Sequence, residues 1–181
     1  MSSIATRLTP FTLLLFFLFS LNISAQKPAP PKVNPGSINW LKYDQGLKQA
    51  GKEKKKIMVF FYTDWCGYCK KMNNYTYKDE EIKKILAKNF VSVTVNGESK
   101  NSILVDKANI TERELTSRFG VRGFPTIWFL EPNAEKISPL IGYRDAKNFA
   151  DVLSYVADNW YKTLSFEEYL KKKEQLNKDK K

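Results

Sequence analysis

Runs of apolar residues predict the strands of a sheet in this chain. The near-continuous apolar run Lys56–Tyr62 is typical of a strand that is buried on both faces of a sheet. Polar residues alternate with valines in the next such segment, which favours a second strand there. With the later apolar segments, we expect four strands at residues 56–62, 91–95, 126–130 and 136–143.

Helical spacing of apolar positions predicts helices between and beside these strands. A rough helical face begins at Ile38 and ends near Gly51, and another covers residues 79–90. Thr111 and Glu114 have the spacing of a capping box, so they open a short helix that Gly120 closes. The last long helix begins at Asp145, and its expected apolar face is Phe149, Val152, Leu153, Val156 and Trp160. We expect a loop over residues 96–110, and the whole order indicates an α/β layered sandwich with a mixed sheet.

The first 36 residues differ in composition from the rest of the chain. Arg7 precedes the apolar stretch 11–21, and small residues follow up to Ala25, a pattern typical of a secretory signal peptide over residues 1–25. An uncleaved membrane anchor is the alternative, but a span needs about 20 apolar residues. Residues 26–36 hold four prolines and predict a linker. We therefore expect a domain at 37–162, a basic tail at 163–181, and no integral membrane segment after cleavage.

Charge and histidine content exclude several function classes. The formal net charge is +11, which is compatible with binding nucleic acid or acidic partners. Many of the lysines lie in residues 52–56 and 171–181, which favours solvated helix ends, and export argues against nucleic acid as a partner. The chain has no histidine, so Ser-His and Cys-His nucleophile pairs and histidine metal sites are excluded.

The two cysteines, Cys66 and Cys69, stand three positions apart between the first predicted strand and a helix. Backbone N–H groups and the helix dipole at such a helix N-terminus favour the thiolate of Cys66. Cys69, one turn later, can close a disulfide with it, so the pair can perform thiol–disulfide exchange with neither metal nor cofactor. A structural disulfide would close too small a loop to add much stability. A zinc site would lack ligands.

Here the chain resembles a known family. The segment Trp65–Lys70 after the apolar strand resembles the active-site segment of thioredoxin-fold proteins, and Gly120–Thr126 resembles their second signature. The resemblance implies a thioredoxin-like three-layer sandwich, whose central mixed sheet has about four to five strands flanked by helices. It also implies a cis Phe124–Pro125 bond beside Cys66. Together with Trp65, Gly67 and Tyr68, these two residues form the expected substrate-binding surface.

The end of the chain, from Tyr155 to Leu170, resembles bacterial periplasmic thioredoxin-like proteins of the SoxW and DsbD C-terminal-domain kind. Phe60 occupies the position of the buried aspartate that assists the second cysteine in cytoplasmic thioredoxins, and their lysine on the next strand has no counterpart. We therefore consider Asp64 or Glu98 as proton acceptors for Cys69. Tyr68 replaces the family's proline between the cysteines, which leaves the reducing strength open.

These observations favour an exported, periplasmic or secreted thiol–disulfide oxidoreductase that reduces client proteins, with Cys66 as nucleophile and Cys69 as resolving cysteine. A membrane thiol-electron transporter is the implied electron source. The alternatives are a disulfide oxidase or isomerase, and a non-catalytic binding module with an inert disulfide.

Overall fold

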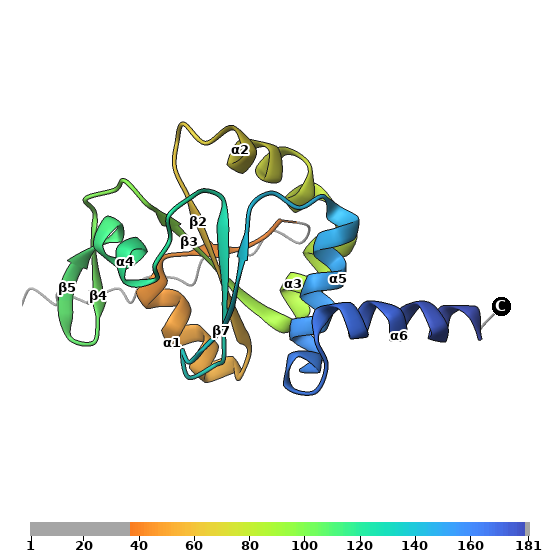
Figure 1. Ribbon diagram of the computed structural model, residues 1–181. Coiled ribbons are helices and arrows are strands. Elements are labelled where there is room, and N and C mark those ends of the chain that lie inside the picture. Colours follow the sequence, from red (N-terminus) through yellow and green to blue (C-terminus); the bar gives the residue numbers. More distant parts are fainter. Residues whose placement is uncertain (1–36, 180–181) are drawn as a thin grey trace, which may run out of the picture. The chain divides into compact units, whose positions relative to one another are not determined.

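A five-stranded mixed sheet organises residues 37–179, which are the residues that the computed structural model describes (Figure 1). The expected signal peptide and linker lie outside this range. The strand order is β1-β3-β2-β6-β7, with β1 and β2 parallel to β3, and β6 antiparallel to both β2 and β7. The strands are β1 Trp40–Leu41, β2 Lys56–Tyr62, β3 Phe90–Asn96, β6 Thr126–Leu130 and β7 Lys136–Ile141. The predicted mixed sheet is confirmed.

Strand β2 lies in the middle of the sheet and supplies both halves of the core. Its side chains alternate between the two faces, as strand geometry requires. Met58 and Phe60 pack on one face, whereas Ile57, Val59 and Phe61 pack on the other, and all five are buried. Because both faces of β2 are buried, the sequence shows a continuous apolar run here rather than an alternating one.

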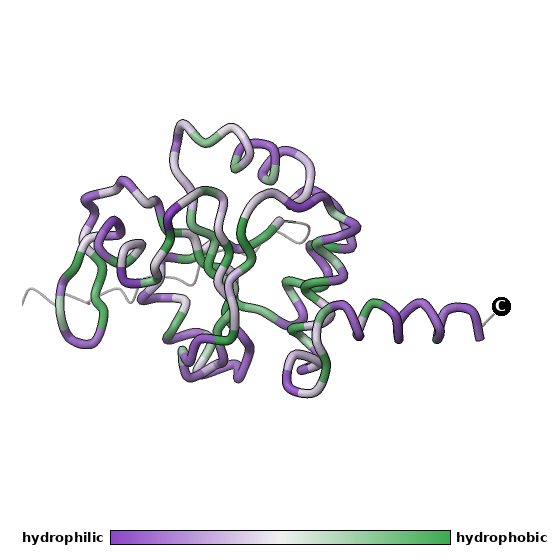
Figure 2. The backbone as a smooth tube through the Cα atoms, in the orientation of Figure 1, coloured by the Kyte–Doolittle hydropathy of each residue, from purple (hydrophilic) through white to green (hydrophobic). Residues whose placement is uncertain are grey.

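Helices cover both faces of the sheet and complete the three layers (Figure 1). One face packs against α3 (Glu80–Asn89) and α5 (Ala146–Ala157). The other packs against α1 (Tyr43–Glu53) and α4 (Glu112–Arg118). Figure 2 shows hydrophobic positions gathered along the strands and hydrophilic ones on the outer turns of the helices.

Side-chain caps fix the helix starts that the sequence indicated. Thr111 and Glu114 form the expected capping box, and Gly120 follows α4 with a φ of +67°. Asp145 accepts a hydrogen bond from the backbone N–H of Asn148 at the start of α5. The bond that Asp145 accepts also lowers the pKa of its carboxyl group.

Four sequence predictions were wrong in detail. The first helix begins at Tyr43, because residues 40–41 pair with β3 as a short edge strand. The predicted loop 96–110 contains the hairpin β4 (Ser102–Val105) and β5 (Ala108–Thr111). The last strand stops at Ile141, and Trp160 lies beyond α5 in the 3-10 turn η2 (Trp160–Lys162).

The C-terminal segment forms helix α6 (Phe166–Lys178) after a capping box between Ser165 and Glu168. Tyr169 anchors this helix, because its buried ring packs against the rings of Tyr155 and Trp160. Within residues 37–179, no helix is long and apolar enough to cross a membrane.

Candidate active site

The two cysteines lie where β2 leads into helix α2 (Gly67–Asn74). Cys66 is the N-cap residue of α2, and its Sγ accepts a hydrogen bond of 3.1 Å from the backbone N–H of Cys69. The two sulfurs form a disulfide bond, with the Cα atoms 5.2 Å apart. This position directs free N–H groups of the first helical turn at Cys66, which stabilises negative charge on its sulfur when the bond is open.

Two large aromatic side chains flank the buried disulfide. Cys66 and Cys69 keep only 3% and 1% of their surface, whereas Trp65 and Tyr68 are 65% and 63% exposed. Between them, Gly67 is exposed, and a Cβ built on it would meet no atom within 4 Å. The glycine is therefore not required by packing within the described residues, and it leaves the approach to Cys66 open.

The loop before β6 forms the second part of the site. The Phe124–Pro125 peptide bond is cis. The ring of Phe124 meets the ring of Trp65 edge-on, with centroids 6.2 Å apart. The two signatures, far apart in sequence, are therefore joined by a direct aromatic contact.

The segment after β7 forms the third part of the site. The N–H of Gly142 donates to the carbonyl of Pro125 at 2.9 Å, and its φ is +85°. The ring of Tyr143 lies 6.0 Å from that of Tyr68 and 4.6 Å from Nζ of Lys71. Three segments therefore enclose the disulfide.

Two further residues position these segments and were not predicted as part of the site. The buried Thr76, in the 3-10 turn η1 (Thr76–Lys78) after α2, donates its hydroxyl to the carbonyl of Arg144 at 2.7 Å. Gly97, directly after β3, lies against Phe124, since a Cβ there would be 2.4 Å from the Cζ atom of the ring. Gly97 fell within the predicted loop 96–110, so its contact with the site was missed.

The buried core cluster that contains the two cysteines is rich in aromatic side chains. Phe60 is 1% exposed, and the rings of Trp40, Tyr62 and Tyr77 lie 5.2–5.8 Å from its own. Burial raises the pKa of Tyr77 well above its ordinary value. Phe60 occupies the position at which cytoplasmic thioredoxins carry a buried aspartate, so this position offers the cysteines no carboxylate.

The two carboxylates considered as proton acceptors are both exposed. Asp64 accepts a hydrogen bond of 3.2 Å from the side-chain amide of Asn96, and the backbone N–H of Glu98 donates to the side-chain oxygen of Asn96. Burial, with a smaller effect of Asp64, raises the pKa of Tyr62. Within residues 37–179, no hydrogen bond joins either carboxylate to Cys69, which is disulfide-bonded here, so their role as proton acceptors stays a prediction.

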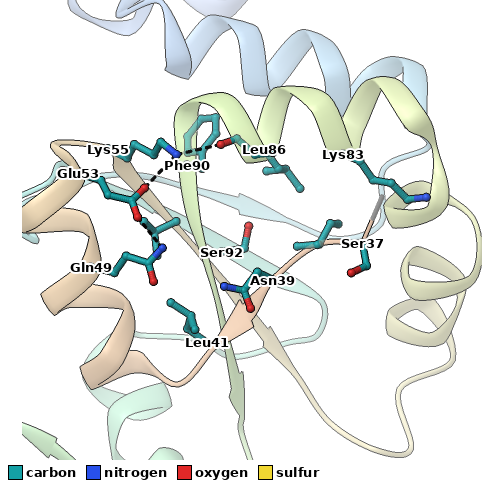
Figure 3. Close-up of a pocket in the computed structure, with 13 residues that line it drawn as sticks. Ser37, Asn39, Leu41, Gln49, Glu53, Lys55, Lys83, Leu86, Phe90 and Ser92 are labelled. Atoms are coloured by element: carbon teal, nitrogen blue, oxygen red, sulfur yellow. Dashed lines mark hydrogen bonds and ion pairs between the residues drawn. The ribbon is translucent and has the colours of Figure 1, made fainter. Parts of the chain in front are cut away.

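A separate pocket of about 210 Å³ lies at the other end of β2 (Figure 3). It is bounded by Glu53, Lys55 and Phe90, near the amino ends of β2 and β3. Lys55 donates to the carbonyl of Ala87 at 3.0 Å and pairs with Glu53. Because Cys66 follows the carboxyl end of β2, this pocket is not part of the disulfide site. The described residues also contain no group of three or more side chains that could hold a metal ion.

Comparisons with known proteins agree with this geometry. Residues 43–157 match the family described as Thioredoxin-like domain. A solved thioredoxin from Thermus thermophilus is 28% identical and superposes with a TM-score of 0.56 over 66% of this chain and 87% of that one.

Curated relatives include a protein disulfide-isomerase of Hordeum vulgare, 26% identical over 71% of this chain. They also include the thiol:disulfide interchange protein DsbD of Photorhabdus laumondii, 29% identical over 65% of this chain. This chain spans about a fifth of the length of these two proteins, 22% and 19%.

Proposed function

Since the chain belongs to the thioredoxin-like family of thiol–disulfide oxidoreductases, we propose that it reduces disulfide bonds of client proteins. The observation that carries this proposal is the position of Cys66 at the N-cap of α2, disulfide-bonded to Cys69. A helix N-terminus favours the thiolate, which is the attacking species in thiol–disulfide exchange.

The exchange has two steps, and both balance in atoms and electrons. The Cys66 thiolate attacks one sulfur of the client disulfide, so a mixed disulfide forms and the client's other sulfur leaves as a thiolate that takes a proton. Cys69 then loses its proton and attacks Sγ of Cys66, which releases the second client thiol. The client gains two electrons, and the Cys66–Cys69 pair ends as the disulfide.

The residues around the disulfide would hold the client. Trp65 and Tyr68 offer exposed rings, and Gly67 leaves space between them. Phe124 and Pro125 lie on the neighbouring loop, in contact with Trp65 through the Phe124 ring. We expect an extended client segment to lie across this surface, with its cysteine beside Cys66.

The proposal includes export of the chain and an external source of electrons. A signal peptide at residues 1–25 and a linker at 26–36 would deliver the domain at 37–162 and its tail at 163–181 to the periplasm or outside the cell. There the oxidised pair needs re-reduction, so a membrane thiol-electron transporter is the expected partner. The similarity to a thiol:disulfide interchange protein supports exchange with thiol or disulfide partners.

Insulin reduction tests the proposed activity. The pre-reduced protein, supplied with a dithiol reductant, should precipitate the insulin B chain much faster than the reductant alone. A Cys66→Ser variant is the matched control, because it keeps the fold and removes the attacking sulfur. A wild-type rate no higher than that of Cys66→Ser would refute the proposal.

A second candidate function is supply or isomerisation of disulfides, which the similarity to protein disulfide-isomerases favours. The reduction potential of the Cys66–Cys69 pair separates the two candidates. A value of about −270 mV is expected for a reductant, and one of about −120 mV for an oxidant. A redox titration in glutathione or dithiothreitol buffers measures this value directly.

A further inference from the structure

Four basic residues belong to the segments that form the site, and we call Lys70, Lys71, Arg122 and Arg144 the basic rim. They come from the three segments that enclose Cys66, namely residues 64–71, 121–125 and 141–144. Asp64 is the single acidic residue in these segments, and it is hydrogen-bonded to Asn96. None of the basic rim forms an ion pair within residues 37–179, whereas Lys83 and Lys173, for example, do.

Two members of the basic rim converge on Tyr143. Nζ of Lys71 lies 4.6 Å from the centre of the Tyr143 ring, and one guanidinium nitrogen of Arg144 donates to the Tyr143 carbonyl at 2.8 Å. A guanidinium carries five N–H donors, so Arg144 keeps several for a ligand. The Tyr143 ring in turn lies 6.0 Å from Tyr68, which places both charges beside the cysteine motif.

Hydrogen bonds hold the backbone segment that carries Arg144. Gly142 is bonded to Pro125, and the Arg144 carbonyl accepts the hydroxyl of the buried Thr76. The positive charges therefore belong to the same framework as the disulfide and do not sit on a free terminus. A positioned pair of unneutralised cations next to an apolar surface attracts carboxylates, and the attraction also speeds encounter.

We propose that the basic rim selects clients whose reactive cysteine is flanked by acidic residues. The carboxylates of such a segment would pair with Lys71 and Arg144 while its apolar side chains contact Trp65 and Tyr68. This inference rests on the proposed reductase function and adds a class of preferred substrate to it. The formal net charge of +11 acts in the same direction over longer distances.

The test uses three disulfide-bonded reporter peptides of equal length, whose residues flanking the cysteine are glutamate, glutamine or lysine. We compare kcat/KM of the pre-reduced full chain for the three peptides. The wild type should reduce the glutamate peptide fastest and the lysine peptide slowest. This preference should fall with salt, because the Debye length drops from about 30 Å at 0.01 M to about 3 Å at 1 M.

The variant is the double substitution Lys71→Gln/Arg144→Gln, and the matched control is Lys48→Gln/Lys52→Gln. Lys48 and Lys52 are exposed on α1 and form no ion pair within the described residues, so the control removes the same charge away from the site. The rim variant should lower the glutamate-to-glutamine ratio of kcat/KM on the order of threefold to tenfold. The control should leave this ratio unchanged.

The ratio isolates client preference, since a change in the intrinsic reactivity of Cys66 affects both peptides alike. Equal rates for the three peptides, or an equal fall in the ratio for rim and control variants, would overturn the inference. The glutamine peptide keeps the two proposals apart. If it is reduced without any preference among peptides, the reductase function stands and the acidic preference fails, whereas no reduction of any peptide refutes the function itself.

Discussion

Gly97→Ala is expected to weaken client binding by displacing the ring of Phe124. A Cβ at position 97 would lie 2.4 Å from Cζ and 2.8 Å from Cε1 of that ring. The ring must move by about 1 Å before the closer contact reaches an ordinary 3.4 Å. Because the Phe124 ring contacts Trp65, this shift disturbs the surface on which the client is proposed to lie.

The size of the effect on stability and on KM depends on how far the Phe124 ring can move. Overpacking of a closed core costs about 1–3 kcal/mol, but Phe124 is half-buried, so we expect about 1 kcal/mol of lost stability. The displacement should raise the KM for insulin on the order of fivefold, since misplacing a group by about 1 Å commonly has effects of this size or larger. The reduction potential should not change, because Cys66 and Cys69 keep their contacts.

A double-mutant cycle identifies the cause. In a Phe124→Ala background the clash is absent, so Gly97→Ala should have no further effect on KM. Gly51→Ala is the control, because a Cβ at this exposed helical position meets nothing within 4 Å and should stabilise the protein by about 0.5–1 kcal/mol. An unchanged KM for Gly97→Ala, or an effect that persists with alanine at position 124, would refute the reasoning.

Two further substitutions test the scaffold. Gly46→Ala should destabilise the protein by about 1–2 kcal/mol, because the added Cβ would lie 2.2 Å from Cγ2 of the buried Val93. Urea denaturation measures this loss, and a gain in stability would contradict the packing of α1 on β3. Glu131→Gln should cost about 1 kcal/mol near neutral pH, since the hydrogen bond from Tyr161 and the pair with Lys162 lower the pKa of Glu131 below 4.5. A carboxyl group whose pKa is lowered by folding stabilises the fold above about pH 4.5, and this stabilisation is lost as the pH falls through the lowered pKa. The thermal melts of wild type and variant should therefore converge in acid. A difference that stays constant down to about pH 2 would mean that the Glu131 charge has no such role.

The sequence predicted the parts of the fold that one strong local signal specifies. The strand Lys56–Tyr62 agrees with its predicted bounds, because burial on both faces produces an unbroken apolar run. The capping box at Thr111 was equally clear, since the spacing of Thr and Glu reflects two definite hydrogen bonds. Both features depend on neighbours in the chain and require no knowledge of tertiary structure.

The hairpin of β4 and β5 was missed because its turn lacks the usual residues. Asp106 and Lys107 form the two-residue turn, with φ values of +50° and +68°. Two positive φ values are typical of a type I′ turn, which usually carries Asn-Gly or Asp-Gly. With lysine in the second position, nothing local marked the turn, so the segment was taken for a loop.

Within the site, the sequence indicated the cysteine motif and the proline loop but not what holds them together. The contact of Gly97 with Phe124, and the hydrogen bond from Thr76 to Arg144, join residues 27 and 68 positions apart. Such contacts arise from the topology of the sheet, and a single sequence has no periodic signal for them. The basic rim was likewise not predicted, since its members are dispersed among three segments of the sequence.

Trapping of mixed disulfides tests the central claim most directly, namely that Cys66 attacks and Cys69 resolves. The reduced Cys69→Ser variant is mixed with oxidised insulin, quenched in acid and analysed by mass spectrometry, with Cys66→Ser as the matched control. The account predicts that Cys69→Ser accumulates an insulin adduct that dithiothreitol releases, and that Cys66→Ser does not. No adduct with Cys69→Ser, or adducts of equal amount with both variants, would contradict it and favour a binding module whose disulfide is inert.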